Sequence, residues 1–397
     1  MQDTTDTNER QTEDLPLTGV EVVEVAEGVA GPYCGRLLAA FGATVVKVER
    51  PPQGDWSRRI GPSLSDDSPS ESSALYLYNN MGKKSVLLDW ETESGMDDLV
   101  SLVSKADIFI EDWDCGYRET TGISAERLIP EDRGPINLCV TPFGLTGPYS
   151  RWKSSPIVQL ALGGYLNIMG SPFKEPLMLP GRQPDYLTGL NAYNAVQMAL
   201  WERAMDGHGQ FVEVSMLETL TNLHQATLEM DGNVRMRNGH RQSALSTRAF
   251  PPGLATLPAE DGNVTFGGGS VAIWEQVCLM LGREDIVANS DLDDVAGFAD
   301  LADEMERILI TWMKGRTKKD VFMEASRDWM LPVAPVLELD EVLADPQFND
   351  RGLFQDVDHP VAGIATYPTL PFVTSGTVPT LGRAPLLGEH TKEVLGR

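Results

Sequence analysis

Short runs of β-branched residues alternate with amphipathic segments over roughly the first 230 residues. Strands are predicted at 20–25, 45–49, 106–112, 136–141 and 210–215, and helices at 33–41, 95–105, 157–164, 186–205 and 216–230. Strands separated by helices form parallel sheets, because each crossover returns the chain to the same edge. We therefore expect one doubly wound α/β domain over residues 17–230.

The pattern changes after residue 230. Residues 231–253 are rich in Arg, Asn, Gly and Pro, which is typical of a linker between units. Beyond them, a strand at 263–266 and helices near 271–281, 298–314 and 318–329 predict a smaller α+β domain, so that linker and domain occupy 231–335. Residues 336–397 contain a long irregular stretch, which we expect to wrap back over the large domain or a partner subunit.

Charge and cysteine content narrow the classes of function. The formal net charge is −26, from 32 basic and 58 acidic residues, and such a surface repels nucleic acid and anionic lipid. Residues 1–16 read as a disordered acidic tail, and no run approaches the ~20 apolar residues of a membrane span. We expect a cytoplasmic protein. Its four cysteines are widely spaced, which predicts no metal site.

Asp185 stands directly before a predicted helix, in the run PGRQPDYLTGLNAY. Pro184 restricts Gln183 away from the helical conformation, so we expect the helix to begin just after Asp185. The helix dipole stabilises a carboxylate at that position. Local sequence favours an ordinary N-cap, and a functional carboxylate is the alternative.

Other candidates for a ligand site lie near the start of the chain. The segment Ala30-Gly31-Pro32 stands between a strand and a helix, where local sequence favours a tight turn and the alternative is that its amides bind the pantetheine or phosphate of a ligand. Basic residues form either an island for a phosphate-bearing ligand or solvated surface charge: Lys47, Arg50, Arg58, Arg59, Lys83 and Lys84. The run 267–269 is either a strand-to-helix turn or a mobile loop. No GxGxxG, Walker or GxSxG motif supports nicotinamide, ATP or a serine nucleophile.

Five segments follow one another in a characteristic order between about Leu17 and Leu395. They are LTGVEVVEVAEGVAGPYCGRLLAAFGATVVKVERPPQGDWSRR at the start, NNMGKKSVLLDW at 79–90, PFGLTGPY at 142–149, GHGQFVEVSMLE at 207–218 and APLLGEHTKEVL at 384–395. Together they resemble the family III CoA-transferases, the group that includes formyl-CoA transferase and the carnitine and bile-acid CoA-transferases. Each segment alone is a weak signal, but five in order are a strong one.

The resemblance implies a fold and a reaction. The implied fold is a Rossmann-like large domain with a parallel sheet plus a smaller α+β domain, in a homodimer of interlocked rings. Asp185, ahead of Thr188-Gly189, is implied as the nucleophile that forms an aspartyl anhydride and then an aspartyl-CoA thioester. The implied substrates are an acyl-CoA and a free carboxylic acid, with no permanently bound cofactor.

The resemblance also implies which residues contact CoA. They are Gly28, Val29, Ala30, Arg50, Lys83 and Arg118. Backbone amides rather than histidine are expected to stabilise the oxyanion, since the chain has five histidines. Arg182 is a candidate to receive an acidic substrate.

Some positions depart from the family pattern. Asp112 stands where the family usually has Asn, Thr120 where it has Arg, and Ser154-Ser155 where it has Tyr or His followed by Asp. No Gly-rich acyl loop is found at 231–253, which argues against oxalate or formate as substrate.

The sequence is also compatible with two other functions. One is a racemase-type isomerase of 2-methylacyl-CoA, which needs a base and an acid on either side of the α-carbon. Racemases of this fold use a histidine at the place held here by Ser154-Ser155. The other is a catalytically inactive CoA-binding subunit, against which the presence of Asp185 in its motif argues.

Overall fold

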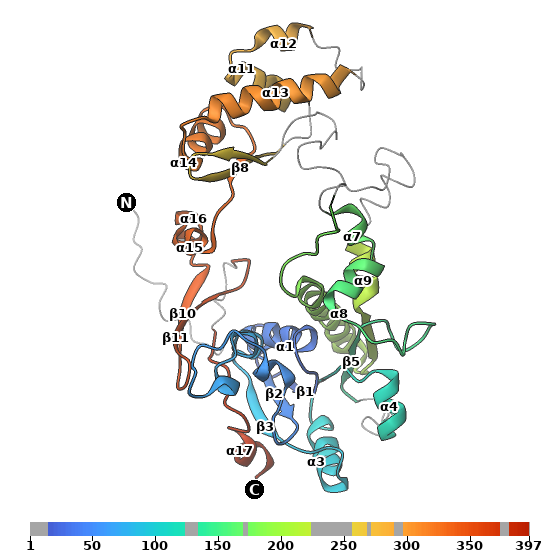
Figure 1. Ribbon diagram of the computed structural model, residues 1–397. Coiled ribbons are helices and arrows are strands. Elements are labelled where there is room, and N and C mark those ends of the chain that lie inside the picture. Colours follow the sequence, from blue (N-terminus) through green and yellow to red (C-terminus); the bar gives the residue numbers. More distant parts are fainter. Residues whose placement is uncertain are drawn as a thin grey trace. The chain divides into compact units, whose positions relative to one another are not determined.

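The computed structural model describes residues 15–123, 134–169, 174–223, 256–267, 271–289, 297–373 and 381–396. The described residues within 1–163, 179–223 and 346–397 form one compact unit, and those within 164–178 and 224–345 form a second (Figure 1). Residues 1–14 of the predicted tail, the predicted linker at 231–253 and the end of the glycine run lie outside the described residues.

The first unit is built on a six-stranded parallel sheet with the order β3-β2-β1-β4-β5-β6. The strands are β1 (Glu21–Glu24), β2 (Thr44–Glu49), β3 (Lys84–Leu87), β4 (Ile108–Glu111), β5 (Ile136–Thr141) and β6 (Phe211–Ser215). The predicted α/β class and parallel sheet are thus confirmed. Strand order reverses between β1 and β4, and open sheets of this kind bind ligands at the carboxyl ends of the strands at that switch point.

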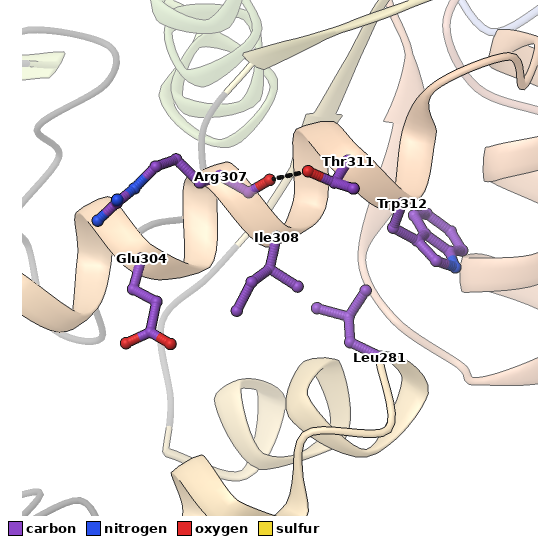
Figure 2. Close-up of a pocket in the computed structure, with 6 residues that line it drawn as sticks. All are labelled: Leu281, Glu304, Arg307, Ile308, Thr311 and Trp312. Atoms are coloured by element: carbon purple, nitrogen blue, oxygen red, sulfur yellow. Dashed lines mark hydrogen bonds between the residues drawn. The ribbon is translucent and has the colours of Figure 1, made fainter.

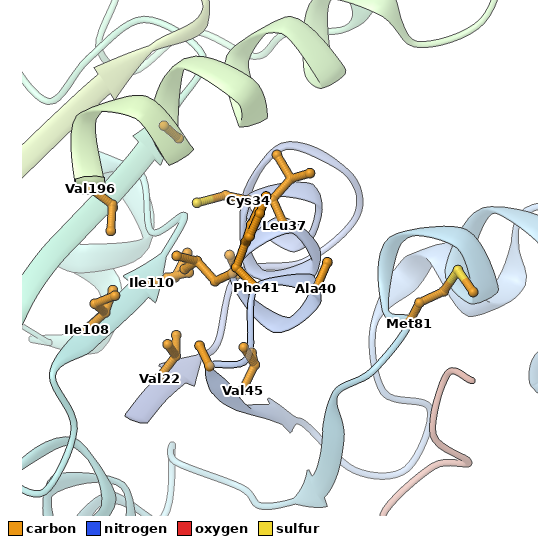
Figure 3. Close-up of a cluster of buried hydrophobic side chains, with 14 of the residues drawn as sticks. Val22, Cys34, Leu37, Ala40, Phe41, Val45, Met81, Ile108, Ile110 and Val196 are labelled. Atoms are coloured by element: carbon orange, nitrogen blue, oxygen red, sulfur yellow. The ribbon is translucent and has the colours of Figure 1, made fainter. Parts of the chain in front are cut away.

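Two long helices cover one face of this sheet. Helix α1 (Ala30–Ala40) packs against α8 (Gln183–Asp206), and Figure 3 shows their side chains meeting those of the strands in one cluster. Leu37 of α1, Val196 of α8 and Ile108 of β4 all belong to it. Leu99 of α3 (Glu93–Val103) packs in a second cluster, with residues of the strands that point to the other face. Burial on both faces explains why the central strands are almost continuously apolar.

The turn predicted at Ala30-Gly31-Pro32 is wrong. These three residues form the first turn of α1, with Val29 as the N-cap. Proline is accepted there because the first amides of a helix have no intrahelical partner.

Shorter helices complete the first unit. They are the 3₁₀ helix η2 (Trp56–Arg59), α2 (Ala74–Asn79), α4 (Cys115–Thr121), α6 (Pro156–Leu162), α9 (Met216–Leu223), α16 (Pro346–Asp350) and α17 (Thr391–Leu395). A hairpin of β10 (Phe354–His359) and β11 (Gly363–Pro368) lies in a region where the sequence shows no clear period. The part of α9 predicted beyond residue 223 lies outside the described residues.

The C-terminal segment covers the edge strand β3. The amide of His390 donates to the Ser85 carbonyl at 2.9 Å, and the amide of Ser85 donates to His390 Nδ1 at 3.2 Å. The amide of Leu87 donates to Thr391 Oγ1 at 3.0 Å. An exposed edge strand is thereby protected from pairing with other chains.

The second unit combines a small antiparallel sheet with helices. Its strands are β7 (Thr256–Ala259), β8 (Gly262–Phe266) and β9 (Val333–Pro335), in the order β7-β8-β9. Its helices are α7 (Tyr165–Ile168), α11 (Val271–Met280), α12 (Glu284–Asn289), α13 (Gly297–Met313), α14 (Lys318–Phe322) and α15 (Leu339–Ala344). Trp274, Leu309 and Val321 are fully buried in its core. In the described part of the chain, no helix is long and apolar enough to cross a membrane.

Candidate active site

A cavity of about 300 Å³ lies at the carboxyl ends of the central strands of the first unit. Its walls come from residues that follow β1, β4 and β5 and from the first residues of α1, α6, α8 and α9. Val29, Ala30 and Asp185, all predicted as site residues, line it together. The cavity therefore occupies the switch point at which this type of sheet binds ligands.

Asp185 is the third residue of α8, not its cap. The helix begins at Gln183 and its N-cap is Arg182, so the prediction that the helix starts after Asp185 is wrong. Pro184 takes the second position of the helix, where its missing N–H breaks no intrahelical bond. The Oδ2 atom of Asp185 is buried and has no hydrogen-bond partner among the described residues.

Burial raises the pKa of Asp185 above its ordinary value, while nearby Arg182 and the Asp185 backbone amide oppose the rise. Each of these effects has a clear origin, since burial disfavours the charged form and a nearby cation favours it. An ionised Asp185 thus has a poorly solvated oxygen that no donor occupies. Such an oxygen is suited to attack an electrophilic carbonyl.

Gly189 sets how closely α8 approaches α1. A Cβ atom at Gly189 would lie 2.5 Å from the Ala30 carbonyl oxygen and 3.1 Å from Tyr33 Cβ. Residues four apart share one face of a helix, so the same contact brings Asp185 to the first turn of α1. The amides of Ala30 and Gly31 open that helix, and no acceptor for them is recorded among the described residues. Amides at a helix start favour negative charge.

A network of buried charges holds the loop between β1 and α1. Asp55 accepts the Gly28 amide with both oxygens, at 2.9 and 3.0 Å. Lys47 Nζ lies 2.7 Å from Asp55 Oδ2 and 3.1 Å from Glu24 Oε1, and it also donates to the Ala26 carbonyl. These bonds fix the backbone that leads into the cavity.

Trp56 packs directly on Gly28. The glycine has φ +82°, and a Cβ atom there would lie 2.0 Å from the Trp56 ring, so only glycine fits. The guanidinium of Arg182 lies 4.8 Å from the centroid of the same ring, and both side chains line the cavity. Sequence reasoning missed Trp56, although its place just after Gly54-Asp55 in a matched segment was a usable signal.

The predicted basic CoA contacts lie outside the cavity lining. Lys83 is buried and donates to Glu24, Asn80 and the Pro32 carbonyl, and burial lowers its pKa to about 8. The structure therefore places the Lys83 ammonium in an internal ion pair. Its contact with CoA stays a prediction.

The two predicted arginine contacts are also paired. Arg50 Nη1 lies 2.6 Å from Glu91 Oε1, and Arg118 bonds Glu111 and the Trp113 carbonyl. Arg50 is about one-third exposed, so this pair leaves it accessible to a ligand from solvent. Both contacts stay predictions.

A second cavity, of about 370 Å³, lies in the second unit (Figure 2). It is lined by residues of α13 and by Leu281 after α11. Thr311 Oγ1 donates to the Arg307 carbonyl at 2.7 Å, so its hydroxyl hydrogen is committed. No residue predicted for the site lines this cavity, and it offers no activated nucleophile among its described residues. Nor do the described residues contain a His, Cys, Asp or Glu group that could hold a metal.

The doubly wound sheet has at its switch point a cavity and a buried carboxylate oxygen without a partner among the described residues, an arrangement typical of α/β enzymes. The chain belongs to CoA-transferase family III, whose family model matches residues 17–391. It is an enzyme of the CoA-transferase class, as the resemblance of its five segments predicted, and CoA is a substrate of that class.

Curated relatives match almost the whole chain. The succinate–glutarate CoA-transferase of Agrobacterium fabrum is 29% identical over 387 residues, which cover 96% of this chain and 95% of that protein. The succinyl-CoA:mesaconate CoA-transferase of Haloarcula hispanica is 31% identical over 392 residues, with the same two coverages. A crystal structure of a CaiB/BaiF family protein from Brucella suis superposes with a TM-score of 0.80 at 28% identity, covering 96% of this chain and 99% of that one.

Proposed function

We propose that this protein transfers CoA from an acyl-CoA to a free carboxylic acid through covalent intermediates on Asp185. The observation that carries the proposal is the Oδ2 atom of Asp185, which is buried at the cavity without a hydrogen-bond partner among the described residues. Asp185 also stands in the x-x-Thr-Gly context that the family resemblance assigns to the nucleophile.

The proposed reaction proceeds through two anhydrides. The Asp185 carboxylate attacks the thioester carbonyl of the donor, the C–S bond breaks, and CoA thiolate leaves a mixed anhydride. The thiolate then attacks the aspartyl carbonyl, which releases the donor acid and leaves an Asp185–CoA thioester. The acceptor carboxylate attacks this thioester, and the freed thiolate attacks the acceptor carbonyl of the second anhydride. Asp185 is regenerated, and each step is easier than direct exchange.

The start of α1 supports this chemistry. Negative charge develops on a carbonyl oxygen in every step, and fixed amide donors stabilise it without reorganisation. The amides of Ala30 and Gly31 open α1 beside the cavity, so we assign them the oxyanion. Hydrolysis of an anhydride is slow only where water is excluded, as in a narrow cavity.

Arg182 is our candidate to receive the acid substrate. It is the cationic side chain among the described residues of the cavity lining. Its stacking on Trp56 fixes the guanidinium while its N–H groups stay available to a carboxylate. Succinyl-CoA is the donor we propose to test first, because the Haloarcula relative is named for it.

The residues at the place of the racemase histidine argue against a racemase. The described residues of the cavity lining include no histidine, and Ser154 accepts a hydrogen bond from Gln159 Nε2 at 2.6 Å. Serine hydroxyls are poor proton donors and acceptors at neutral pH, whereas racemisation needs an acid and a base.

We also propose a homodimer. Leu190, Met198, Trp201 and Met205 form an exposed apolar stripe along α8, with the last three between 70% and 71% exposed. An apolar stripe of this extent needs a partner surface, and a second copy of the chain is the occupant we propose. Interlocking of the two subunits and a cytoplasmic location stay predictions.

The test is a covalent adduct. After incubation with succinyl-CoA, mass spectrometry of peptides should find a CoA adduct on the peptide that contains Asp185. Asp185→Asn keeps the shape of the side chain but removes the nucleophile, so we expect transfer to fall by at least about 1,000-fold with unchanged thermal unfolding.

The matched control is Asp114→Asn. Asp114 lines the same cavity, but its carboxylate caps α4 by accepting the Tyr117 amide at 2.8 Å. Asparagine is an equally good cap, so this variant should form the adduct. Full transfer by Asp185→Asn would contradict the proposed function.

A further inference from the structure

A second carboxyl group, that of Asp112, shares the cavity with Asp185. Asp112 directly follows β4, and its Oδ2 atom accepts the amide of Glu27, which follows β1, at 3.0 Å. The cavity lining contains the carboxyls of Glu27, Asp112, Asp114 and Asp185, but Arg182 is its one cation among the described residues. So many carboxylates around one cation would repel an acidic substrate if all were ionised.

Two buried or half-buried cations of the first unit, Lys47 and Arg118, are bound to other groups. Lys47 is paired with Glu24 and Asp55, and Arg118 bonds Glu111. No ion pair of Asp112 is recorded among the described residues. The fold therefore supplies counterions to Glu24, Asp55 and Glu111, and no counterion of Asp112 is recorded among the described residues.

The charged groups around Asp112 come from six parts of the first unit. They are Glu27 after β1, Lys47 on β2, Asp55 before η2, Glu111 on β4, Asp114 and Arg118 at α4, and Arg182 and Asp185 at α8. Burial, the strongest effect, raises the pKa of Asp112 to about 8, and the charges of Glu27 and Glu111 add to the rise against Lys47 and the Glu27 amide. Below about pH 8 the carboxyl thus keeps its proton.

We propose that Asp112, as a neutral carboxylic acid, donates a hydrogen bond to the carboxylate of the acceptor acid in the Asp185 cavity. A protonated carboxyl has one O–H donor, while an ionised one only accepts and repels an anion. The cavity of about 300 Å³ suits the reacting end of a thioester and a small acid. This inference rests on the proposed transfer and names a binding residue for its second substrate.

The test separates the two half-reactions. Asp185 is first loaded with CoA from succinyl-CoA, excess donor is removed, and consumption of the adduct is followed against succinate concentration on both sides of pH 8. In the wild-type protein, the half-saturating succinate concentration should rise by about ten-fold per pH unit above the pKa of Asp112.

Asp112→Asn should abolish this rise. The amide keeps an acceptor for the Glu27 N–H and donates a hydrogen bond at every pH. The half-saturating concentration should therefore stay flat. Asp114→Asn, as the control, should keep the wild-type rise, and thermal unfolding of each variant checks that it is folded.

Each other outcome has a separate meaning. Absence of any adduct overturns the proposed function and this inference with it. An adduct whose consumption by Asp112→Asn shows the wild-type rise overturns the inference alone. In a third outcome, pH changes the half-saturating succinyl-CoA concentration of the loading step and not that of succinate. Asp112 would then contact the donor, which overturns its assignment to the acceptor acid.

Discussion

Asp185 and Lys47 have opposite electrostatic environments. Lys47 is surrounded by carboxylates, and attraction to Asp55 and Glu24 raises its pKa despite burial. Asp185 has an oxygen without a donor among the described residues, and burial raises its pKa. Paired charges thus fix the loop before α1, while the residue that we propose as the nucleophile has a carboxylate oxygen without a paired donor among the described residues.

Replacement of Lys47 tests whether its ion pairs stabilise the fold. Lys47→Met leaves the carboxylates of Glu24 and Asp55 buried without one of their cations, which should cost about 3–5 kcal/mol of unfolding free energy. Denaturant unfolding gives the value. Lys84→Met, which removes an exposed pair with Glu393, should cost less than about 1 kcal/mol. Equal costs for the two variants would contradict the structural role of Lys47.

Sequence alone singled out Asp185, the nucleophile that we propose, but not its surroundings. Local rules made Asp185 a helix cap, and only the resemblance of the wider segment made it reactive. Asp112 departs from the family pattern in the sequence, but the role that we propose for it depends on which cations lie near it. Lys47 lies on β2 and Arg118 on α4, and each is paired with another carboxylate, Asp55 and Glu111 respectively. Local spacing encodes neither pair.

At the scale of elements, the contact between α1 and α8 builds the site. Gly189→Ala adds a methyl group where backbone already lies within 2.5 Å, so the two helices must separate. We expect a loss of about 1–3 kcal/mol in stability, although alanine is the better helix former, and about a ten-fold fall in kcat/KM.

The control for Gly189→Ala lies on another helix, away from the cavity and from the apolar stripe of α8. Ser101 is exposed on α3, so Ser101→Ala should leave stability and kcat/KM close to those of the wild-type protein. Steady-state kinetics and thermal unfolding of both variants decide the outcome. A Gly189→Ala variant with wild-type kcat/KM would show that the helix contact does not position Asp185.

Strands with continuous apolar or β-branched runs could be predicted from sequence, whereas β3 and β10 could not. Strands β4 and β5 are buried along their whole length and were found from their apolar runs. β3 is a four-residue edge strand that contains Lys84 and Ser85, and β10 exposes polar residues on one face. Their stability comes from neighbours distant in sequence, so their own pattern carries little signal.

For the whole molecule, the exposed stripe on α8 predicts self-association. Trp201→Glu places a charge in the centre of this apolar surface, which should convert the proposed dimer to a monomer. Size-exclusion chromatography with light scattering measures the result. Leu339→Glu is a matched control, because Leu339 is 84% exposed on α15 and lies outside the stripe. A wild-type protein that is already monomeric would sink the proposal.

The division of the chain into units shows a limit of sequence reading. The described residues of 164–178 belong to the second unit although they lie within the stretch predicted as one large domain. No change in amino-acid composition marks either end of the segment 164–178. Domain membership here depends on contacts made by later parts of the chain, which a scan along the sequence does not contain.

The bonds between the C-terminal segment and β3 have a consequence for how the protein is made. Ser85 and His390 are 305 positions apart, so a ribosome releases the edge strand long before the segment that covers it. During that interval the nascent chain has an open strand edge that other nascent chains can pair with. The sheet closes only after synthesis is nearly finished. An mRNA truncated close to the end of its coding region would therefore yield an aggregation-prone polypeptide rather than a slightly shorter enzyme.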